Sequence, residues 1–186
     1  MRRDEKPPAA RETGVGPTTA MSAHAIIAPV GLDDWSDVRH LHARAFDKLV
    51  AAHLDDNEAQ ACRDMLSSHE YGEALQHANL MGAWIDGYLV ATCNWQPADD
   101  AGASARLGAL FVDPLFARSG LGRRLALETE ALARAAGFRA YSVHAPANAV
   151  AFFAAIGYSI ASHGIHAIDS SIGFPVAFMR KVDPPA

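Results

Sequence analysis

The pattern of apolar and polar positions divides the chain into short segments that alternate between strand and helix. Residues 25–30 form an apolar run, which predicts a first strand. From there to Leu49, apolar residues recur at the spacing of an amphipathic helix, and either residue of the preceding Asp-Asp pair can cap its first turn. Two stretches rich in alanine, glutamine and acidic residues predict further helices, at 56–66 and 70–77.

The middle of the chain carries a hairpin signal. Asp86 and Gly87 stand between the apolar runs LMGAWI and YLVATCNW. An Asp-Gly pair between two apolar runs favours a tight turn that joins antiparallel strands. We therefore expect the two runs to pair with each other.

The second half of the chain continues the alternation. Residues 105–112 predict a strand that ends before Pro114, and a helix follows at 121–136, with Leu125 and Leu132 expected on its apolar face. The remaining segments predict a strand at 140–144, a helix at 148–156, a strand from Tyr158 and a last strand at 175–182. Elements in this order predict a mixed α/β fold.

Composition supports one ordinary globular domain. Half of the 186 residues are hydrophobic and 20% are charged, and this length is enough to bury a core. Residues 1–22 combine charged residues with prolines and glycines, so we expect a disordered tail there and a single domain over 23–186. Met21, which lies shortly before the first strand, is a second candidate for the start of translation.

Charge, cysteine content and hydropathy argue against several classes of protein. The formal net charge of -5 does not suit a nucleic-acid-binding surface. Cys62 and Cys93 form neither a CxxC motif nor a disulfide framework, and the histidines show no convergent set of metal ligands. No apolar run approaches the roughly 18 residues of a membrane span. We therefore expect a cytoplasmic protein that binds no metal, nucleic acid or membrane.

The sequence ARSGLGRR, residues 117–124, lies where a strand has ended and a helix begins. Gly120 and Gly122 allow the backbone to come close to a phosphate. The first turn of a helix also presents N–H groups without intrahelical partners, at the positive end of the helix dipole. Three arginines in the segment add positive charge. These features predict a phosphate-binding loop, although a pair of glycines alone also occurs in plain tight turns.

Two common phosphate motifs do not fit this loop. A dinucleotide fingerprint needs a third glycine where Leu125 stands, and a nucleotide P-loop needs Gly-Lys followed by Ser or Thr. VDPLFARSGLGRRL instead resembles the pyrophosphate-binding motif of the GNAT superfamily of acyl-CoA N-acyltransferases. The family pattern, Gln/Arg-x-x-Gly-x-Gly/Ala, is matched at Gly120 and Gly122, while Ala117 occupies the first position and Arg118 follows it.

Residues 144–158, HAPANAVAFFAAIGY, resemble a later element of the same family, which closes the other side of the cofactor. Phe153 departs from the pattern, because many relatives have a tyrosine there whose hydroxyl can protonate the departing CoA thiolate. Phenylalanine cannot donate that proton. The positions that match are Asn148, Ala149, Val150, Phe152, Gly157 and Tyr158.

The resemblance implies a fold and a cofactor site. The implied fold is a mixed α/β one, in which helices flank a central, mostly antiparallel sheet with a splayed pair of parallel strands. A bulge would separate the strand at 105–112 from its neighbour and free its backbone to pair with the pantetheine arm. The implied cofactor contacts are the backbone of Leu110, Phe111 and Val112, the loop amides of Arg118, Ser119, Gly120, Leu121, Gly122 and Arg123, and, from the second element, Asn148 and Phe153.

The implied function is transfer of an acetyl group from acetyl-CoA directly to an amine of a small molecule or peptide. His144 is the candidate base, because it ends a strand beside the second motif and its pKa range suits proton transfer; the alternative is a histidine bonded to backbone at a strand end. Trp95 and Gln96 are candidates for the acceptor pocket. Phe153 also favours an alternative, a catalytically weak domain that senses acyl-CoA or serves within a complex. The sequence leaves open whether the protein forms a homodimer.

Overall fold

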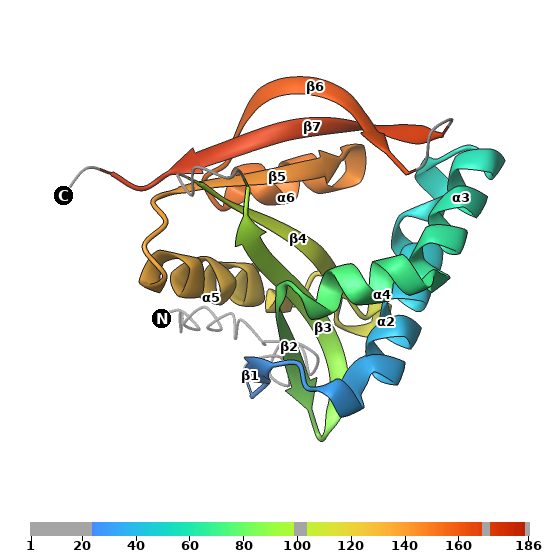
Figure 1. Ribbon diagram of the computed structural model, residues 1–186, viewed down its shortest axis with the longest axis horizontal. Coiled ribbons are helices and arrows are strands. Elements are labelled where there is room, and N and C mark those ends of the chain that lie inside the picture. Colours follow the sequence, from blue (N-terminus) through green and yellow to red (C-terminus); the bar gives the residue numbers. More distant parts are fainter. Residues whose placement is uncertain (1–23, 99–103, 169–171, 185–186) are drawn as a thin grey trace, which may run out of the picture.

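A seven-stranded mixed sheet forms the centre of the molecule. The computed structural model describes residues 24–98, 104–168 and 172–184, and the tail expected at 1–22 lies outside them. The strand order is β1-β2-β3-β4-β5-β7-β6. Figure 1 shows this sheet with helices on both of its faces.

The observed elements confirm the predicted alternation, with ends that shift by a few residues. The segment expected as a helix at 148–156 begins as a 3-10 turn before α6. The strands are β1 (Ile26–Pro29), β2 (Asn79–Ile85), β3 (Tyr88–Pro97), β4 (Ser104–Val112), β5 (Ala140–Pro146), β6 (Ser159–Ala167) and β7 (Gly173–Val182). The helices are α2 (Trp35–Leu49), α3 (Asp56–Ser67), α4 (His69–Gln76), α5 (Leu121–Ala135) and α6 (Val150–Ala155), with short 3-10 helices η1 (Leu32–Asp34), η2 (Ala51–His53), η3 (Pro114–Phe116) and η4 (Ala147–Ala149).

Strands β1 to β4 form an antiparallel half of the sheet. Asp86 and Gly87 turn the chain between β2 and β3 with φ of 51° and 81°, so the predicted hairpin is confirmed. Only glycine, aspartate and asparagine adopt this left-handed conformation readily, which explains why the pair marks the turn.

Strands β4 and β5 are the parallel pair, and they stay together only briefly. Their register covers three residue pairs and ends at Arg106 and Ser142. Beyond these residues the two strands diverge, as Figure 1 shows. On the other side, β5 pairs with β7, and β7 with β6, in antiparallel fashion. The sheet therefore consists of two antiparallel halves that are joined at one end and open at the other, as the resemblance implied.

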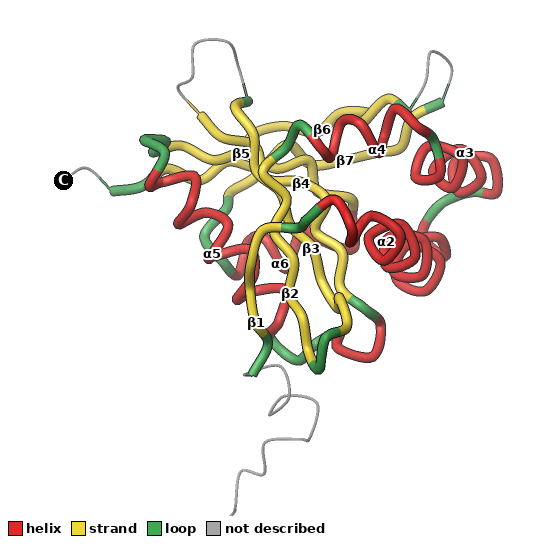
Figure 2. The backbone as a smooth tube through the Cα atoms, turned by 60° about the horizontal axis from the view of Figure 1, so that its bottom comes forward, coloured by secondary structure: helices red, strands yellow, loops and turns green. Residues whose placement is uncertain are grey.

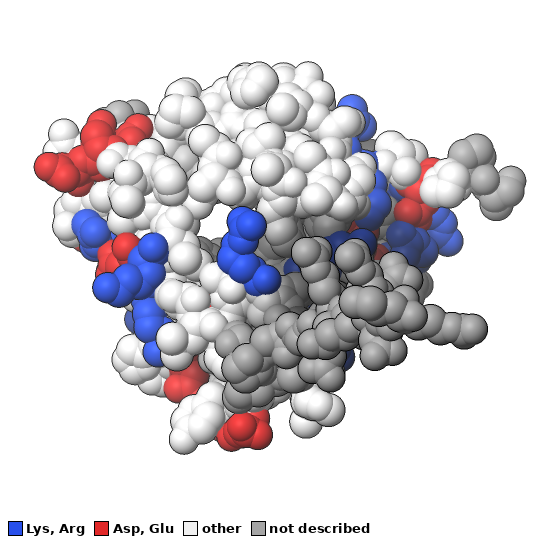
Figure 3. Space-filling model, turned by 180° about the vertical axis from the view of Figure 1, so that it is seen from behind, with Lys and Arg blue, Asp and Glu red and all other residues white. Residues whose placement is uncertain are grey.

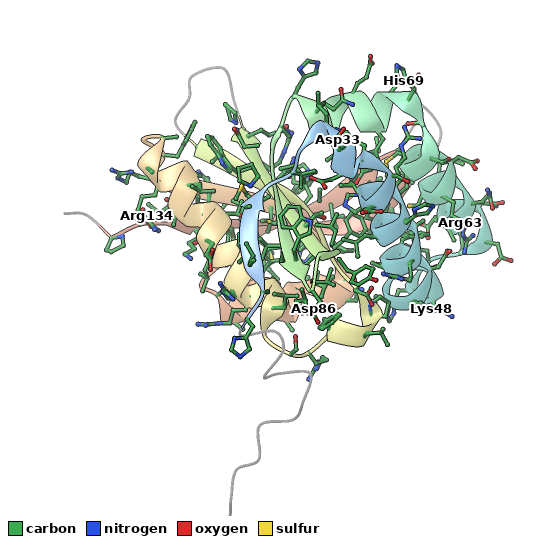
Figure 4. All side chains as sticks on the ribbon, turned by 90° about the horizontal axis from the view of Figure 1, so that it is seen from below. Asp33, Lys48, Arg63, His69, Asp86 and Arg134 are labelled. Carbon is green, nitrogen blue, oxygen red and sulfur yellow. The ribbon has the colours of Figure 1, made fainter. Side chains whose placement is uncertain are left out.

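The helices form a layer on each face of the sheet. Figure 2 shows α5 and α6 on one side and α2, α3 and α4 on the other. Figure 4 shows the same division from below, with Arg134 of α5 and Arg63 of α3 at opposite sides of the molecule. The largest core cluster lies on the α5 face, whereas two smaller clusters lie beneath α2, α3 and α4.

The buried face of α5 differs from the expected one. Leu125 is fully buried as predicted, but Leu132 is 42% exposed. The buried residues that follow Leu125 are Ala126, Thr129, Glu130 and Ala133, so the buried face is turned away from Leu132 and towards Glu130. Glu130 can lie on this face because it forms an ion pair with Lys181 of β7.

Two expectations from composition can be compared with the described residues. Both cysteines, Cys62 and Cys93, are buried and form no disulfide. Among the residues that the structure describes, no helix has the length and apolar character needed to cross a membrane.

Candidate active site

A bulge interrupts β4 just beyond the point where β5 departs. Thr92 pairs with Phe111 and Asn94 with Gly108, so two residues of β4 face one residue of β3. One of the two, Ala109, has φ of 44°, a left-handed conformation that costs an alanine about 1 to 2 kcal/mol. The bulge that the resemblance implied is therefore present, and it contains a strained residue.

The last residues of β4 turn their side chains to both faces of the sheet. Leu110 and Val112 pack against the core on the α5 face, while Phe111 packs with the cluster beneath α2 and α3. The β4–β5 pairing has already ended at Arg106, so within the described part of the chain these three residues have no strand partner on the β5 side. Their backbone therefore borders the opening between the two halves of the sheet.

The glycine loop leads from β4 into α5. Gly120 caps the helix with φ of 89°, which explains the need for glycine, and Arg118 adopts φ of 65°. At Gly122 a Cβ atom would come within 3.1 Å of the Val112 side chain, so the absence of a side chain brings α5 close against β4. The helix thus begins directly at the end of the opening, and its first N–H groups lie there.

Positive charge surrounds this loop. Arg118 and Arg123 are exposed, and Arg124 donates to Glu128 one turn along α5. Behind the loop, Asp113 is buried and accepts hydrogen bonds from the backbone N–H of Leu115 and from Arg44. Asp113 therefore holds the chain after β4 in place, which is a structural role. Figure 3 views the molecule from behind and shows Lys and Arg side chains on both sides of a hollow near the middle of this face.

The second motif lies on the β5 side of the opening. The Asn148 side chain donates to the carbonyl oxygen of Leu49 at 2.9 Å, which ties η4 to the end of α2. Phe153 is 7% exposed, and its ring lies edge-on to Tyr158 in the core. Contacts of Asn148 and Phe153 with a cofactor stay predictions.

His144 lies on β5, two residues past the last pair with β4. Its Nδ1 atom is 3.4 Å from Nδ1 of His166, and its ring meets the Phe178 ring edge-on. Burial lowers the pKa of His144, and the positive charge of Arg106 and the neighbouring His166 lower it further. The imidazole is therefore neutral near pH 7 and able to accept a proton. His166 lies on β6, 22 residues further along the chain, so the sequence does not indicate that it meets His144.

A hydrogen-bonded chain of three side chains reaches the bulge from the α2 face. His42 of α2 is fully buried, its Nε2 atom is 2.7 Å from the Thr92 hydroxyl, and its Nδ1 atom is 2.9 Å from the Tyr71 hydroxyl. Thr92 in turn donates to the carbonyl oxygen of Ala109 at 2.9 Å. The His42 ring also stacks on Phe111, with 4.1 Å between centroids. Its position four residues after Val38, on the apolar stripe, was the one signal of burial in the sequence.

The burial of His42 predicts a pH dependence of stability. Desolvation lowers its pKa from 6.5 to about 3, so between these pH values the unfolded chain holds a proton that the folded chain does not. The free energy of unfolding should therefore decrease as pH falls through this window, by at most about 1.4 kcal/mol per pH unit from this residue. Urea unfolding of the wild type and His42→Gln between pH 7 and pH 4 measures the effect, since other groups cancel in the difference. Parallel pH profiles would contradict it.

A cavity of about 740 Å³ lies between α3, α4 and the β6–β7 hairpin. Tyr71 lines this cavity, and its hydroxyl group is hydrogen-bonded to His42. The cavity therefore borders one end of the hydrogen-bonded series Tyr71–His42–Thr92. Trp95 and Gln96, the candidates from the sequence, are not among the described residues that line it; Trp95 packs against Phe138 instead. The lining consists of Asn57, Gln60, Ala61, Asp64, Met65, Ser68, Glu70, Tyr71, Ile168 and Ile172.

Metal ligation has no candidate among residues 24–98, 104–168 and 172–184. No three His, Cys, Asp or Glu side chains within these ranges are placed to hold one ion. Within these described ranges, the His144–His166 pair has no third side chain placed to complete a metal site.

Comparison with known proteins agrees with this geometry. The family model described as Acetyltransferase (GNAT) family matches residues 35–158, whereas no curated protein matches the chain. A GCN5-related N-acetyltransferase from Rhodopseudomonas palustris superposes with a TM-score of 0.75 at 21% identity, covering 85% of this chain and 95% of that one. A PaiA N-acetyltransferase from Thermoplasma acidophilum, in complex with coenzyme A, gives 0.67 at 17% identity, covering 85% and 98%. A ribosomal-protein-alanine N-acetyltransferase from Brucella melitensis gives 0.60 at 16% identity, covering 84% and 99%.

These structures share the fold at low identity, and the family model covers both sequence motifs together with α5 and β5 between them. The chain therefore belongs to the acetyltransferase (GNAT) family.

Proposed function

We propose that this protein is an N-acetyltransferase that transfers the acetyl group of acetyl-CoA directly to an amine, with both substrates bound together. The observation that carries the proposal is the opening between β4 and β5, which begins at a bulge and ends at a glycine loop on the N-terminus of α5. An opening of this kind offers an extended ligand free backbone groups along its length and an anion site at its end.

Acetyl-CoA fits the opening by its chemistry. Its pantetheine arm carries amide groups that can pair with the backbone of Leu110, Phe111 and Val112, as an added strand would. Its pyrophosphate would then meet the loop amides from Arg118 to Arg123, where the helix dipole and the exposed arginines favour negative charge. A structural neighbour is described in complex with coenzyme A, which supports this choice of ligand.

The transfer step requires a neutral amine next to the thioester carbonyl. The amine nitrogen forms a bond to the carbonyl carbon, loses a proton, and the carbon–sulfur bond breaks to release CoA as thiolate. His144 is proposed as the proton acceptor, since its lowered pKa keeps the imidazole neutral and it lies beside the opening. Phe153 offers no proton to the leaving thiolate, so the thiolate would take its proton from water.

The cavity beside Tyr71 is proposed as the acceptor site. Asp64 and Glu70 contribute negative charge to its lining, and no lysine, arginine or histidine is among the described residues there. Apolar groups, among them Met65 and Ile172, complete the wall. This combination favours a small or peptide amine that combines an apolar body with positive charge.

The cytoplasm is the compartment that we propose for this protein. Cys62 and Cys93 are buried and form no disulfide with each other, which suits a reducing compartment.

A second candidate is a domain that binds acyl-CoA and does not turn it over. Phe153 supports this alternative, because a general acid contributes about a hundredfold to ten-thousandfold to a transfer rate. Loss of that contribution slows the reaction without preventing it, which keeps catalysis as our first proposal.

Calorimetry followed by a thiol-release assay separates these functions. We expect acetyl-CoA to bind, and purified protein to release CoA thiol with at least one member of a panel of cationic and neutral amines. Mass spectrometry of the products should show acceptors that are heavier by one acetyl group. Binding without turnover of any amine would favour the sensor, and absence of acetyl-CoA binding would reject both functions.

A further inference from the structure

We infer that the chain Tyr71–His42–Thr92 is a positioning device, which holds the β4 bulge in the conformation that the acyl-CoA arm requires. This inference rests on the proposed function and adds to it three residues that lie outside both sequence motifs. Thr92 and His42 are fully buried, so neither reaches the cofactor or the acceptor directly. They act through Ala109 and Phe111 of β4.

The direction of the hydrogen bonds follows from their last acceptor. The carbonyl of Ala109 can only accept, so the single hydroxyl proton of Thr92 goes to it. The Thr92 oxygen must then accept from His42, which places the imidazole proton on Nε2. Nδ1 of His42 is left as an acceptor, and it receives the Tyr71 hydroxyl proton. Each donor thus has one partner, and the order of the chain is fixed.

Protonation does not disturb this order near neutral pH. Burial lowers the pKa of His42 to about 3, and a neutral imidazole is the form that can accept at Nδ1 while it donates at Nε2. The chain ends at a backbone carbonyl, so it cannot carry a proton to the reaction. Its role is orientation.

The bulge is the part of the strand that most needs such support. Ala109 has φ of 44°, a conformation that a non-glycine residue keeps only when its surroundings impose it. The hydrogen bond from Thr92 fixes the Ala109 carbonyl in this conformation, and the His42 ring covers Phe111 two residues later. On the other side of the bulge, the Asn94 side chain occupies the space above Gly108. The backbone of Leu110, between these contacts, is therefore held at a defined angle towards the opening.

Substitution of Thr92 tests the device. Thr92→Val keeps the shape and removes the hydroxyl, whereas Thr92→Ser keeps the hydroxyl. We expect Thr92→Val to weaken acetyl-CoA binding roughly tenfold, as loss of one buried hydrogen bond implies, and Thr92→Ser to restore most of it. Binding of adenosine 3′,5′-bisphosphate, which has the nucleotide end of CoA without the pantetheine arm, should be unchanged in both variants, because the glycine loop is not altered.

Thr129→Val is the matched control. It makes the same exchange at another fully buried threonine, on α5, and should leave acetyl-CoA binding at the wild-type value. Equal weakening by Thr92→Val and Thr129→Val, equal loss of both ligands in Thr92→Val, or an unchanged Kd for acetyl-CoA in Thr92→Val would each overturn the inference. Tyr71→Phe should weaken acetyl-CoA binding in the same direction, and an unchanged Kd would remove Tyr71 from the device.

Amide hydrogen exchange tests the device in the free protein. Thr92→Val should exchange faster than Thr92→Ser at residues 108–112, while residues 104–106 exchange at the same rate in both. Identical exchange at 108–112 would reject the positioning role even if acetyl-CoA binds. Failure of the wild type to bind acetyl-CoA would instead reject the proposed function, so the two failures are distinguishable.

Discussion

Gly120→Asp should abolish measurable binding of acetyl-CoA, with a Kd at least roughly 100-fold above that of the wild type. Gly120 is the cap of α5, so an aspartate there places a carboxylate where the loop is expected to hold the pyrophosphate. Two negative groups within a few ångströms repel each other by several kcal/mol near a protein surface. The fold should survive, because aspartate tolerates the left-handed conformation and a negative charge suits a helix N-terminus.

Gly87→Asp provides a matched control for this experiment. Gly87 and Gly120 have φ of 81° and 89°, and at neither position would a Cβ atom meet another group within 4 Å. The two variants therefore introduce the same charge and the same backbone cost, one at the glycine loop and one at the β2–β3 turn. Calorimetric titration with acetyl-CoA should show loss of binding in Gly120→Asp alone. Similar affinities in the two variants would place the phosphate site elsewhere.

Lys181→Met should reduce the free energy of unfolding by about 3 to 5 kcal/mol. The Lys181 ammonium group lies 2.5 Å from the Glu130 carboxylate, whose side chain is only 2% exposed. Methionine keeps the stem of the lysine and removes its charge, which leaves a buried carboxylate without its partner. Denaturant unfolding of the wild type and the variant at pH 7 measures the difference.

Two further variants show whether burial is the cause. Arg63→Met breaks the ion pair with Asp47 on the surface, where the side chains are 43% and 49% exposed, and should cost less than about 1 kcal/mol. The double variant Glu130→Met/Lys181→Met removes both charges of the pair and should recover most of the stability lost in Lys181→Met. A double variant as unstable as the single one would mean that packing, and not the uncompensated charge, sets the cost.

The fold was largely accessible from the sequence because its signals are local. The Asp86-Gly87 turn, the apolar stripe of α2 and the glycine loop are each signalled by residues that are close together in the sequence. Glu130 shows where this limit lies, since its carboxylate can be buried only because Lys181, 51 residues later, comes to meet it. A periodic pattern contains no such information, and it therefore favoured Leu132 for the interior.

The candidate site divides in the same way. The loop from Arg118 to Arg123 and the bulged strand before it follow from a contiguous motif, and in the structure the bulge lies where the opening begins and the loop where it ends. The pairing of His144 with His166, and the chain through His42 and Thr92, join residues that are 22 and 50 positions apart. Only a three-dimensional arrangement assigns partners to these histidines.

The brief contact between β4 and β5 has a thermodynamic consequence. Among the residues that the structure describes, three residue pairs join β4 to β5, so a ligand that contacts both halves of the sheet adds to a short connection. A ligand that binds the folded chain alone adds RT ln(1 + [L]/Kd) to its stability. If acetyl-CoA occupies the opening, the cellular concentration of this metabolite determines not only how fast the protein works but also what fraction of it stays folded.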